Sequence, residues 1–182
     1  LMATARGILK SRATEEGSLA ALLTHLNELL YVDTGGERFM TMLLLTVESQ
    51  PRRVRWASAG HGPPLLLLPD ADSFSELDSG GVPLGILEGE SFEERVETDL
   101  PPGSLLLICT DGVWEARNDE GEQFGLDRVL ETLRSRRDQR VEEIAQALKA
   151  AVERFTARDS QEDDVTFVIA KLLAPEAHPN PS

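Results

Sequence analysis

Carboxylates at the ends of apolar segments are the residues of this chain best suited to chemistry. Asp111 and Gly112 follow the apolar run Leu105–Cys109 after one threonine, and the pair Asp163–Asp164 directly precedes the alternating run Val165–Leu172. A short continuous apolar run is typical of a strand that is covered on both faces. Because Gly112 permits backbone angles that a side chain would hinder, we expect Asp111 to present its carboxylate in a turn at the end of such a strand.

The chain between these carboxylates predicts two amphipathic helices, over residues 126–133 and 141–155, that return it toward its starting point. If the flanking strands are antiparallel neighbours, Asp111 and Asp163 lie side by side. Two adjacent carboxylates repel each other unless a cation lies between them, and Mg²⁺ and Mn²⁺ prefer oxygen ligands. The alternative is an ordinary Asp-Gly turn and a solvated acidic turn, as expected in a chain with 32 acidic residues.

The other groups with reactive side chains give weaker signals. Cys109 is the single cysteine and lies in the apolar run, so we interpret it as a packed small side chain and not as a nucleophile. His61 stands between two glycines and before Pro63, which predicts a turn. Its imidazole is either a polar turn residue or points into a cleft. His25 falls beside a leucine stripe and is interpreted as solvated.

Composition limits the class of protein. A chain of 182 residues with 41% hydrophobic residues predicts one soluble domain with a substantial core. The formal net charge of −14 and the scattered basic residues argue against a nucleic-acid partner. One cysteine fits a reducing cytoplasm, and no apolar stretch approaches the length of a membrane helix.

The order of the predicted elements indicates an α+β fold. Helical periodicity predicts helices over 1–12 and, capped by Ser18, over 19–31. Strands are expected at 39–48 (a central strand), 53–58 (half-exposed), 65–68, 74–77, 92–98 (an edge strand) and 165–172. Residues 80–85, GGVPLG, predict an ordered loop or flap, and residues 174–182 a disordered tail. Strands that follow one another without intervening helices predict antiparallel pairing.

Four stretches, taken together and in this order, resemble a known family. They are AGHGPPLLL (59–67), GGVPLGIL (80–87), PGSLLLICTDGVWEARNDEGEQFG (102–125) and EDDVTFVIAKL (162–172). Each stretch alone is weak, but a TDG-x-x-E-A-x-N segment followed about fifty residues later by DD-x-T on a strand is specific. The sequence resembles the bacterial metal-dependent serine/threonine phosphatases of the type 2C superfamily, in the RsbU/SpoIIE branch.

The resemblance implies an αββα sandwich, in which two antiparallel sheets are flanked by helix pairs, over residues 1–173. It implies two Mn²⁺ or Mg²⁺ ions in the complete domain, with Asp111 and Asp163 as metal ligands and a metal-activated water as the nucleophile. Gly112, Asp164 and His61 are then near-site candidates. At the position of Asp164 type 2C relatives carry Asn, and at that of His61 they carry Asp near an accessory metal.

One part of the family pattern is not in the sequence. The family's sandwich begins with strands and a motif resembling D-V-S-G-H-G, whose Asp bridges both metals, and residues 1–13 match the helix that follows this motif. We therefore expect the fold to lack its first strands here, and the polypeptide as given to hold at most one metal and to be inactive. The helices over 1–13 and 18–31 match those associated, in the bacterial branch, with assembling the metal site.

The resemblance also implies partners. The expected substrate is a phosphorylated regulatory protein, of the STAS-type anti-sigma-factor antagonist class, and an upstream sensor or receiver domain is expected. Nucleic acid and membrane are not expected as partners, and the expected location is the cytoplasm. An alternative is a non-catalytic pseudophosphatase domain that binds a signalling partner. The presence of both Asp111 and Asp163 counts against it, because a scaffold has no need of both ligand positions.

Overall fold

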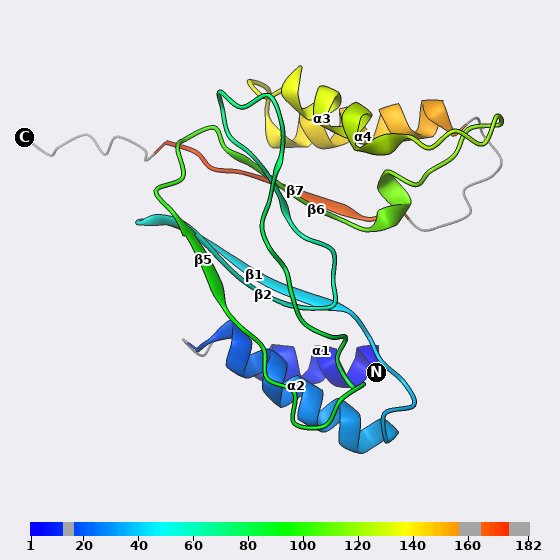
Figure 1. The fold of residues 1–182 in the computed structure, drawn as a ribbon. Helices are drawn as coiled ribbons and strands as arrows, with labels where there is room; N and C mark the ends of the chain where they lie inside the picture. Colours follow the sequence, from blue (N-terminus) through cyan, green and yellow to red (C-terminus); the bar gives the residue numbers. More distant parts are fainter. Residues whose placement is uncertain (13–16, 157–164, 175–182) are drawn as a thin grey trace, which may run out of the picture. The chain divides into compact units, whose positions relative to one another are not determined.

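The computed structural model describes residues 1–12, 17–156 and 165–174. The chain divides into two compact units, and it passes between them three times. Unit 1 comprises Leu1–His61 and Asp78–Asp99, and unit 2 comprises Gly62–Leu77 and Leu100–Ser182. Each unit joins helices to an antiparallel sheet (Figure 1).

Unit 1 contains two helices and a sheet. The helices are α1 (Met2–Arg12) and α2 (Leu19–Thr34), and the strands are β1 (Met42–Ser49), β2 (Arg52–Ala59) and β5 (Arg95–Thr98), in the order β1-β2-β5. Both helices lie along the same face of this sheet in Figure 1. The core between them is formed by the leucines of α2 and small residues of β2, among them Leu23, Leu26, Leu30, Ala57 and Ala59.

Helix α2 begins and ends at the residues that its sequence indicates. Ser18 has extended backbone angles and accepts a hydrogen bond from the Ala21 N–H at 3.4 Å, as an N-cap does. At the other end Gly35 is left-handed, with φ +62°, and donates its N–H to the Tyr31 carbonyl at 2.7 Å. The predicted helices over 1–12 and 19–31 are confirmed, the second with three further residues.

The segment 85–94 runs antiparallel to α2 and is hydrogen-bonded to it at three levels. Glu94 accepts the Leu19 N–H at 2.6 Å, and the Thr24 hydroxyl accepts the Phe92 N–H at 3.3 Å. Further along, the fully buried Asn27 uses both atoms of its amide: Oδ1 accepts the Gly85 N–H at 2.8 Å, and Nδ2 donates to the Leu87 carbonyl at 2.9 Å. The loop at residues 80–87 is thus ordered, as predicted.

Glu94 is also the partner of Arg55 on the neighbouring strand. Arg55 Nε donates to Glu94 Oε1 at 2.7 Å, and the Ser18 hydroxyl donates to Glu94 Oε2 at 3.0 Å. Burial raises the pKa of Glu94, but the hydrogen bonds from Arg55, Leu19 and Ser18 and the charge of Arg55 outweigh it, so the net effect is a lowered pKa. The charged carboxylate therefore stabilises the start of α2.

We expect Glu94→Gln to lower the free energy of unfolding by about 1–3 kcal/mol at pH 7, because a charged acceptor is lost. A carboxyl group whose pKa is lowered by folding stabilises the fold above its ordinary pKa of 4.5, and this contribution is lost as the pH falls through the folded-state value. Urea denaturation at pH 7 and pH 3 should therefore show a difference between wild type and variant that shrinks in acid. Glu97→Gln, at an exposed position of β5, is the control and should change little.

Unit 2 contains two helices, a short 3₁₀ helix and a second sheet. The helices are α3 (Gly125–Arg134) and α4 (Val141–Phe155), with the 3₁₀ helix η1 at Asp111–Val113. The strands are β3 (Leu65–Leu67), β4 (Ser75–Glu76), β6 (Leu105–Cys109) and β7 (Phe167–Lys171), in the order β4-β3-β6-β7. Its core joins α3 and α4 to one face of this sheet, through residues that include Leu105, Leu107, Val129, Ile144 and Leu148.

The predicted strands and their antiparallel pairing are confirmed, but two predictions about position in the sheet are wrong. We expected 39–48 to be a central strand, whereas β1 has one partner, β2, among the described residues. The 53–58 segment was expected to be half-exposed, yet β2 pairs on both sides and Val54, Trp56, Ala57, Ser58 and Ala59 are buried. The alternation of arginines with apolar residues was interpreted as one solvent-exposed face of the strand. Arg53 and Arg55 instead form ion pairs on that face, with Glu48 and Glu94 respectively.

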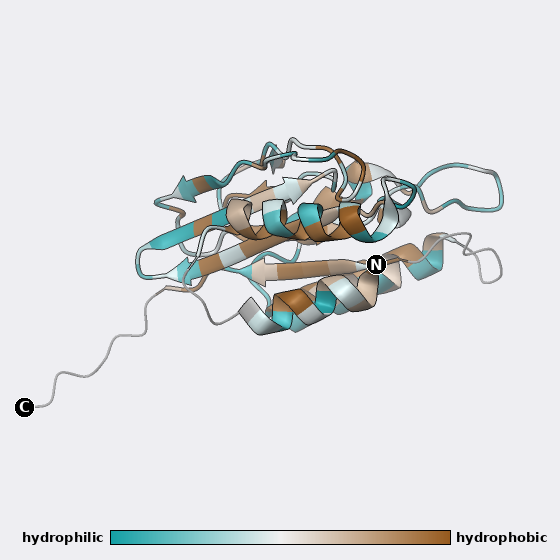
Figure 2. Ribbon diagram, turned by 90° about the horizontal axis from the view of Figure 1, so that it is seen from below, coloured by the Kyte–Doolittle hydropathy of each residue, from teal (hydrophilic) through white to brown (hydrophobic). Residues whose placement is uncertain are grey.

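The hydropathy of the helices agrees with packing through one face only. In Figure 2 the helices are banded in brown and teal, whereas strands contain longer brown stretches. No helix among the described residues is both long and apolar enough to cross a membrane. Of the predicted tail, residues 175–182 lie outside the described part of the chain.

Candidate metal-binding site

Asp111 lies two residues after Cys109, the last residue of β6, at the first position of η1. Its side chain is exposed, whereas Gly112 and Val113 behind it are buried. The Asp111 carbonyl accepts the N–H groups of Trp114, at 3.1 Å, and Glu115, at 2.9 Å, so its backbone is fixed. This arrangement holds an exposed carboxylate on a rigid support at the end of a buried strand.

The role assigned to Gly112 needs a correction. We expected this glycine to provide an unusual backbone angle, but Gly112 is not among the residues with positive φ and lies in the 3₁₀ turn. Its N–H donates to Asp111 Oδ1 at 3.0 Å. One carboxylate oxygen therefore has an internal partner, and the other has no hydrogen bond to a described residue.

The pairing of β6 with β7 meets the condition on which the predicted pair of carboxylates depends. The two strands are antiparallel, with Cys109 opposite Phe167. One residue further on, the Thr110 N–H donates to the Thr166 carbonyl at 3.0 Å, so the end of β6 lies beside the start of β7. Asp163 and Asp164 precede that start and lie outside the described residues, so their place beside Asp111 stays a prediction.

The segment after η1 is a compact hairpin that ends at α3. The Gly125 N–H donates to the Trp114 carbonyl at 2.9 Å, and the Phe124 N–H donates to the Ala116 carbonyl at 2.8 Å. At its tip the side chain of Asn118 accepts the N–H groups of Glu120, at 3.1 Å, and Glu122, at 2.8 Å. The Asn of the TDG-x-x-E-A-x-N segment, Asn118, thus closes a turn. This role was not predicted from the sequence, although an Asn among other turn-forming residues indicates it.

His61 lies outside regular secondary structure, as predicted, and belongs to unit 1. Its carbonyl accepts hydroxyl groups from Ser58, at 3.1 Å, and Ser79, at 3.2 Å. The preceding Gly60 has φ +70°, and a Cβ atom there would stand 2.8 Å from the Pro83 ring. Pro83 therefore packs directly on the backbone of Gly60. The proximity of His61 to a metal stays a prediction.

Cys109 behaves as the apolar residue that the sequence indicates. Its side chain is 8% exposed, and burial raises the pKa of its thiol to about 12. The thiolate is the nucleophilic form of cysteine, and it is negligible at neutral pH for such a group. Cys109 is therefore unsuited to attack a phosphorus atom.

The residues at the end of β6 fit a hard cation only as part of a ligand set. Among the described residues no group of three or more His, Cys, Asp or Glu side chains is placed to hold a metal ion. Asp111 is nevertheless the right donor, since it is exposed, fixed at its backbone and retains an oxygen without a hydrogen bond to a described residue. Further oxygen ligands must come from beyond the described residues or from water.

Two solved structures share the fold of this chain. The SiaA-PP2C domain of Pseudomonas aeruginosa superposes with a TM-score of 0.75 at 20% identity, over 93% of this chain and 66% of that one. RsbX in complex with magnesium gives a TM-score of 0.65 at 22% identity, over 93% of this chain and 71% of that one. These similarities confirm the predicted fold class, an α+β sandwich.

Sequence comparison leads to the same group of proteins. The phosphoserine phosphatase RsbU of Bacillus subtilis is 26% identical over 112 residues, which is 60% of this chain. The match spans 33% of the length of RsbU, so this chain corresponds to about a third of that relative. A sequence model of the family described as Stage II sporulation protein E (SpoIIE) matches residues 1–173. The chain therefore belongs to the SpoIIE family.

Proposed function

We propose that this chain is the larger part of a metal-dependent phosphatase domain that hydrolyses phosphoserine or phosphothreonine on a regulatory protein. The observation that carries the proposal is the exposed carboxylate of Asp111, held on a fixed backbone where the end of β6 lies beside the start of β7. Family membership and the similarity to a phosphoserine phosphatase support the type of reaction.

In this proposal Asp111 and Asp163 hold Mn²⁺ or Mg²⁺, two ions being expected in the complete domain. The magnesium in the related RsbX structure supports the choice of a hard cation. Bound there, such cations would supply a water of lowered pKa and neutralise charge on the phosphoryl oxygens. The contribution of the chain itself is to hold the Asp111 carboxylate in position, through η1, and to leave Cys109 out of the reaction.

The finer expectations are part of the same proposal. The substrate is an anti-sigma-factor antagonist of the STAS type, and a sensor or receiver domain precedes the phosphatase domain. Residues 1–173 form the C-terminal three quarters of the phosphatase domain, without the family's first strands and first metal motif. Gly112, Asp164 and His61 lie near the metals without being essential ligands.

Metal removal tests the proposal on the full-length protein. A phosphoserine-bearing antagonist protein should lose its phosphate in the presence of Mn²⁺, and EDTA should abolish the reaction until Mn²⁺ or Mg²⁺ is added back. Cys109→Ala should leave the rate unchanged, because the buried thiol takes no part. Hydrolysis that persists in EDTA, or that depends on Cys109, would overturn the metal-dependent reaction.

A further inference from the structure

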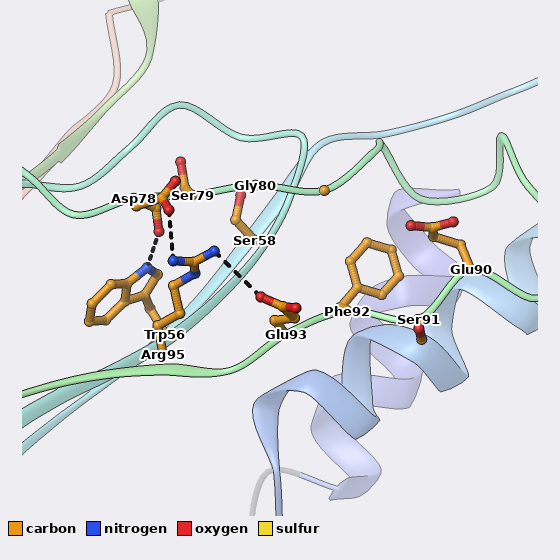
Figure 3. A pocket seen from close by; sticks show the side chains of 11 residues that line it. Trp56, Ser58, Asp78, Ser79, Gly80, Glu90, Ser91, Phe92, Glu93 and Arg95 are labelled. Carbon is orange, nitrogen blue, oxygen red and sulfur yellow. Dashed lines mark hydrogen bonds and ion pairs between the residues drawn. The ribbon is translucent and has the colours of Figure 1, made fainter.

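A pocket of about 200 Å³ is lined entirely by residues of unit 1. Its walls come from β2 and from the segments 78–81 and 90–95 (Figure 3). Two aromatic residues, Trp56 and Phe92, contribute to the lining, and both are otherwise buried, with 4% and 8% exposed surface. The pocket thus combines apolar walls with polar groups at its rim, as side-chain and ligand sites do.

One end of the pocket already holds a guanidinium group. Arg95 pairs with Asp78 at 2.7 Å and with Glu93 at 3.4 Å. The Trp56 indole N–H donates to the Asp78 carbonyl at 2.9 Å and fixes the same loop. Figure 3 shows Arg95 between these two carboxylates, beside the indole. The two carboxylates at this end are therefore placed to hold a planar cation, and Arg95 of the same chain already fills that role.

The other end carries an uncompensated carboxylate. Glu90 lines the pocket together with Ser91 and lies near the Phe92 ring in Figure 3. It has no ion pair or side-chain hydrogen bond with any described residue, in contrast to Asp78 and Glu93. Since the lining includes three carboxylates and one guanidinium, the pocket repels anions and attracts a cation.

We propose that this pocket binds an arginine side chain of a protein partner. Its guanidinium would pair with Glu90, while its apolar stem lies against the Phe92 ring. Arginine suits the pocket better than lysine, because a planar guanidinium forms two parallel hydrogen bonds to a carboxylate and a compact ammonium group does not. Gly80 also lines the pocket, and the space beside it is open, since a Cβ atom added there meets no atom within 4 Å. The inference does not depend on hydrolysis, because it concerns binding alone.

The test uses the full-length protein labelled with 5-fluorotryptophan and a pair of matched probes. N-acetyl-arginine-N′-methylamide should shift the ¹⁹F signal of Trp56 with an affinity on the order of millimolar, as expected for a single side chain. The citrulline counterpart has nearly the same shape without the charge and should give no saturable shift. The Trp56 signal is assigned by its loss in Trp56→Phe. Equal shifts with arginine and citrulline would overturn the proposal.

Three variants locate the binding. Glu90→Gln should weaken arginine binding at least fivefold, whereas Glu88→Gln, an exposed neighbour outside the pocket lining, should leave it unchanged. Gly80→Leu should abolish binding by filling the pocket, and it should fold normally because φ at Gly80 is not in the left-handed region. Unchanged binding in either Glu90→Gln or Gly80→Leu would show that arginine binds elsewhere.

Discussion

Asp111→Asn in the full-length protein should lower Mn²⁺-dependent phosphatase activity by about 100-fold or more. Loss of groups that merely orient metal ligands commonly costs 10- to 100-fold, so loss of a charged ligand should cost at least as much. The substitution is nearly isosteric and keeps an oxygen that can accept the Gly112 N–H. The rate on a phosphoserine protein, measured across Mn²⁺ concentrations, is the appropriate readout, with Mn²⁺ binding by calorimetry beside it.

The control for Asp111 is Asp119→Asn, at an exposed position at the tip of the following hairpin. It removes the same charge from the same segment and should leave both activity and Mn²⁺ binding unchanged. Both variants should unfold within about 0.5 kcal/mol of wild type, since exposed substitutions away from special contacts have small effects. If Asp111→Asn and Asp119→Asn retained equal activity, Asp111 would not be a metal ligand.

Asn27→Ala should lower the free energy of unfolding by about 2–4 kcal/mol. The substitution removes two hydrogen bonds and leaves the buried Gly85 N–H without its acceptor, in addition to creating a small cavity. Chemical denaturation measures the loss. Hydrogen exchange at Gly85 should accelerate, because its N–H then loses its partner on α2.

Glu28→Ala provides the comparison one residue further along α2. Glu28 is exposed, and its one ion-pair contact is a 3.8 Å approach to His25, so its removal should change stability by no more than about 0.5 kcal/mol. A cost for Asn27→Ala as small as that of Glu28→Ala would contradict the role of Asn27 as the link between α2 and the 80–87 loop.

Much of unit 2 could be predicted from its sequence, because its signals are local and strong. The run Leu105–Cys109 is a buried strand, and the apolar periodicity of 126–133 and 141–155 corresponds to α3 and α4 within a residue or two. The helix pair returns the chain toward β6, and β6 and β7 are antiparallel neighbours, which is the condition that the sequence left open. Asp111 lies just after the end of β6, as the sequence pattern predicted.

The contacts of polar residues between distant segments could not be predicted in this way. Asn27 stands within a leucine stripe, and nothing in its neighbourhood indicates that its partners lie 58 and 60 residues away. Glu94 and Arg55 look like ordinary exposed charges in sequence, yet they meet at the start of α2. Such partnerships depend on tertiary approach, which neither periodicity nor turn chemistry encodes.

The division of the chain between the two units has a consequence for folding during synthesis. Unit 1 contains Leu1–His61 and also Asp78–Asp99, so β2 gains its partner β5 only after the first strands of unit 2 have been made. Unit 2 in turn lacks β7 until Phe167–Lys171 has been translated, about 60 residues after its partner β6. Neither unit is a contiguous stretch of polypeptide, so no single cut can release one intact. We therefore expect unit 1 to complete its folding only after Asp99 has left the ribosome, and unit 2 only after β7 has done so.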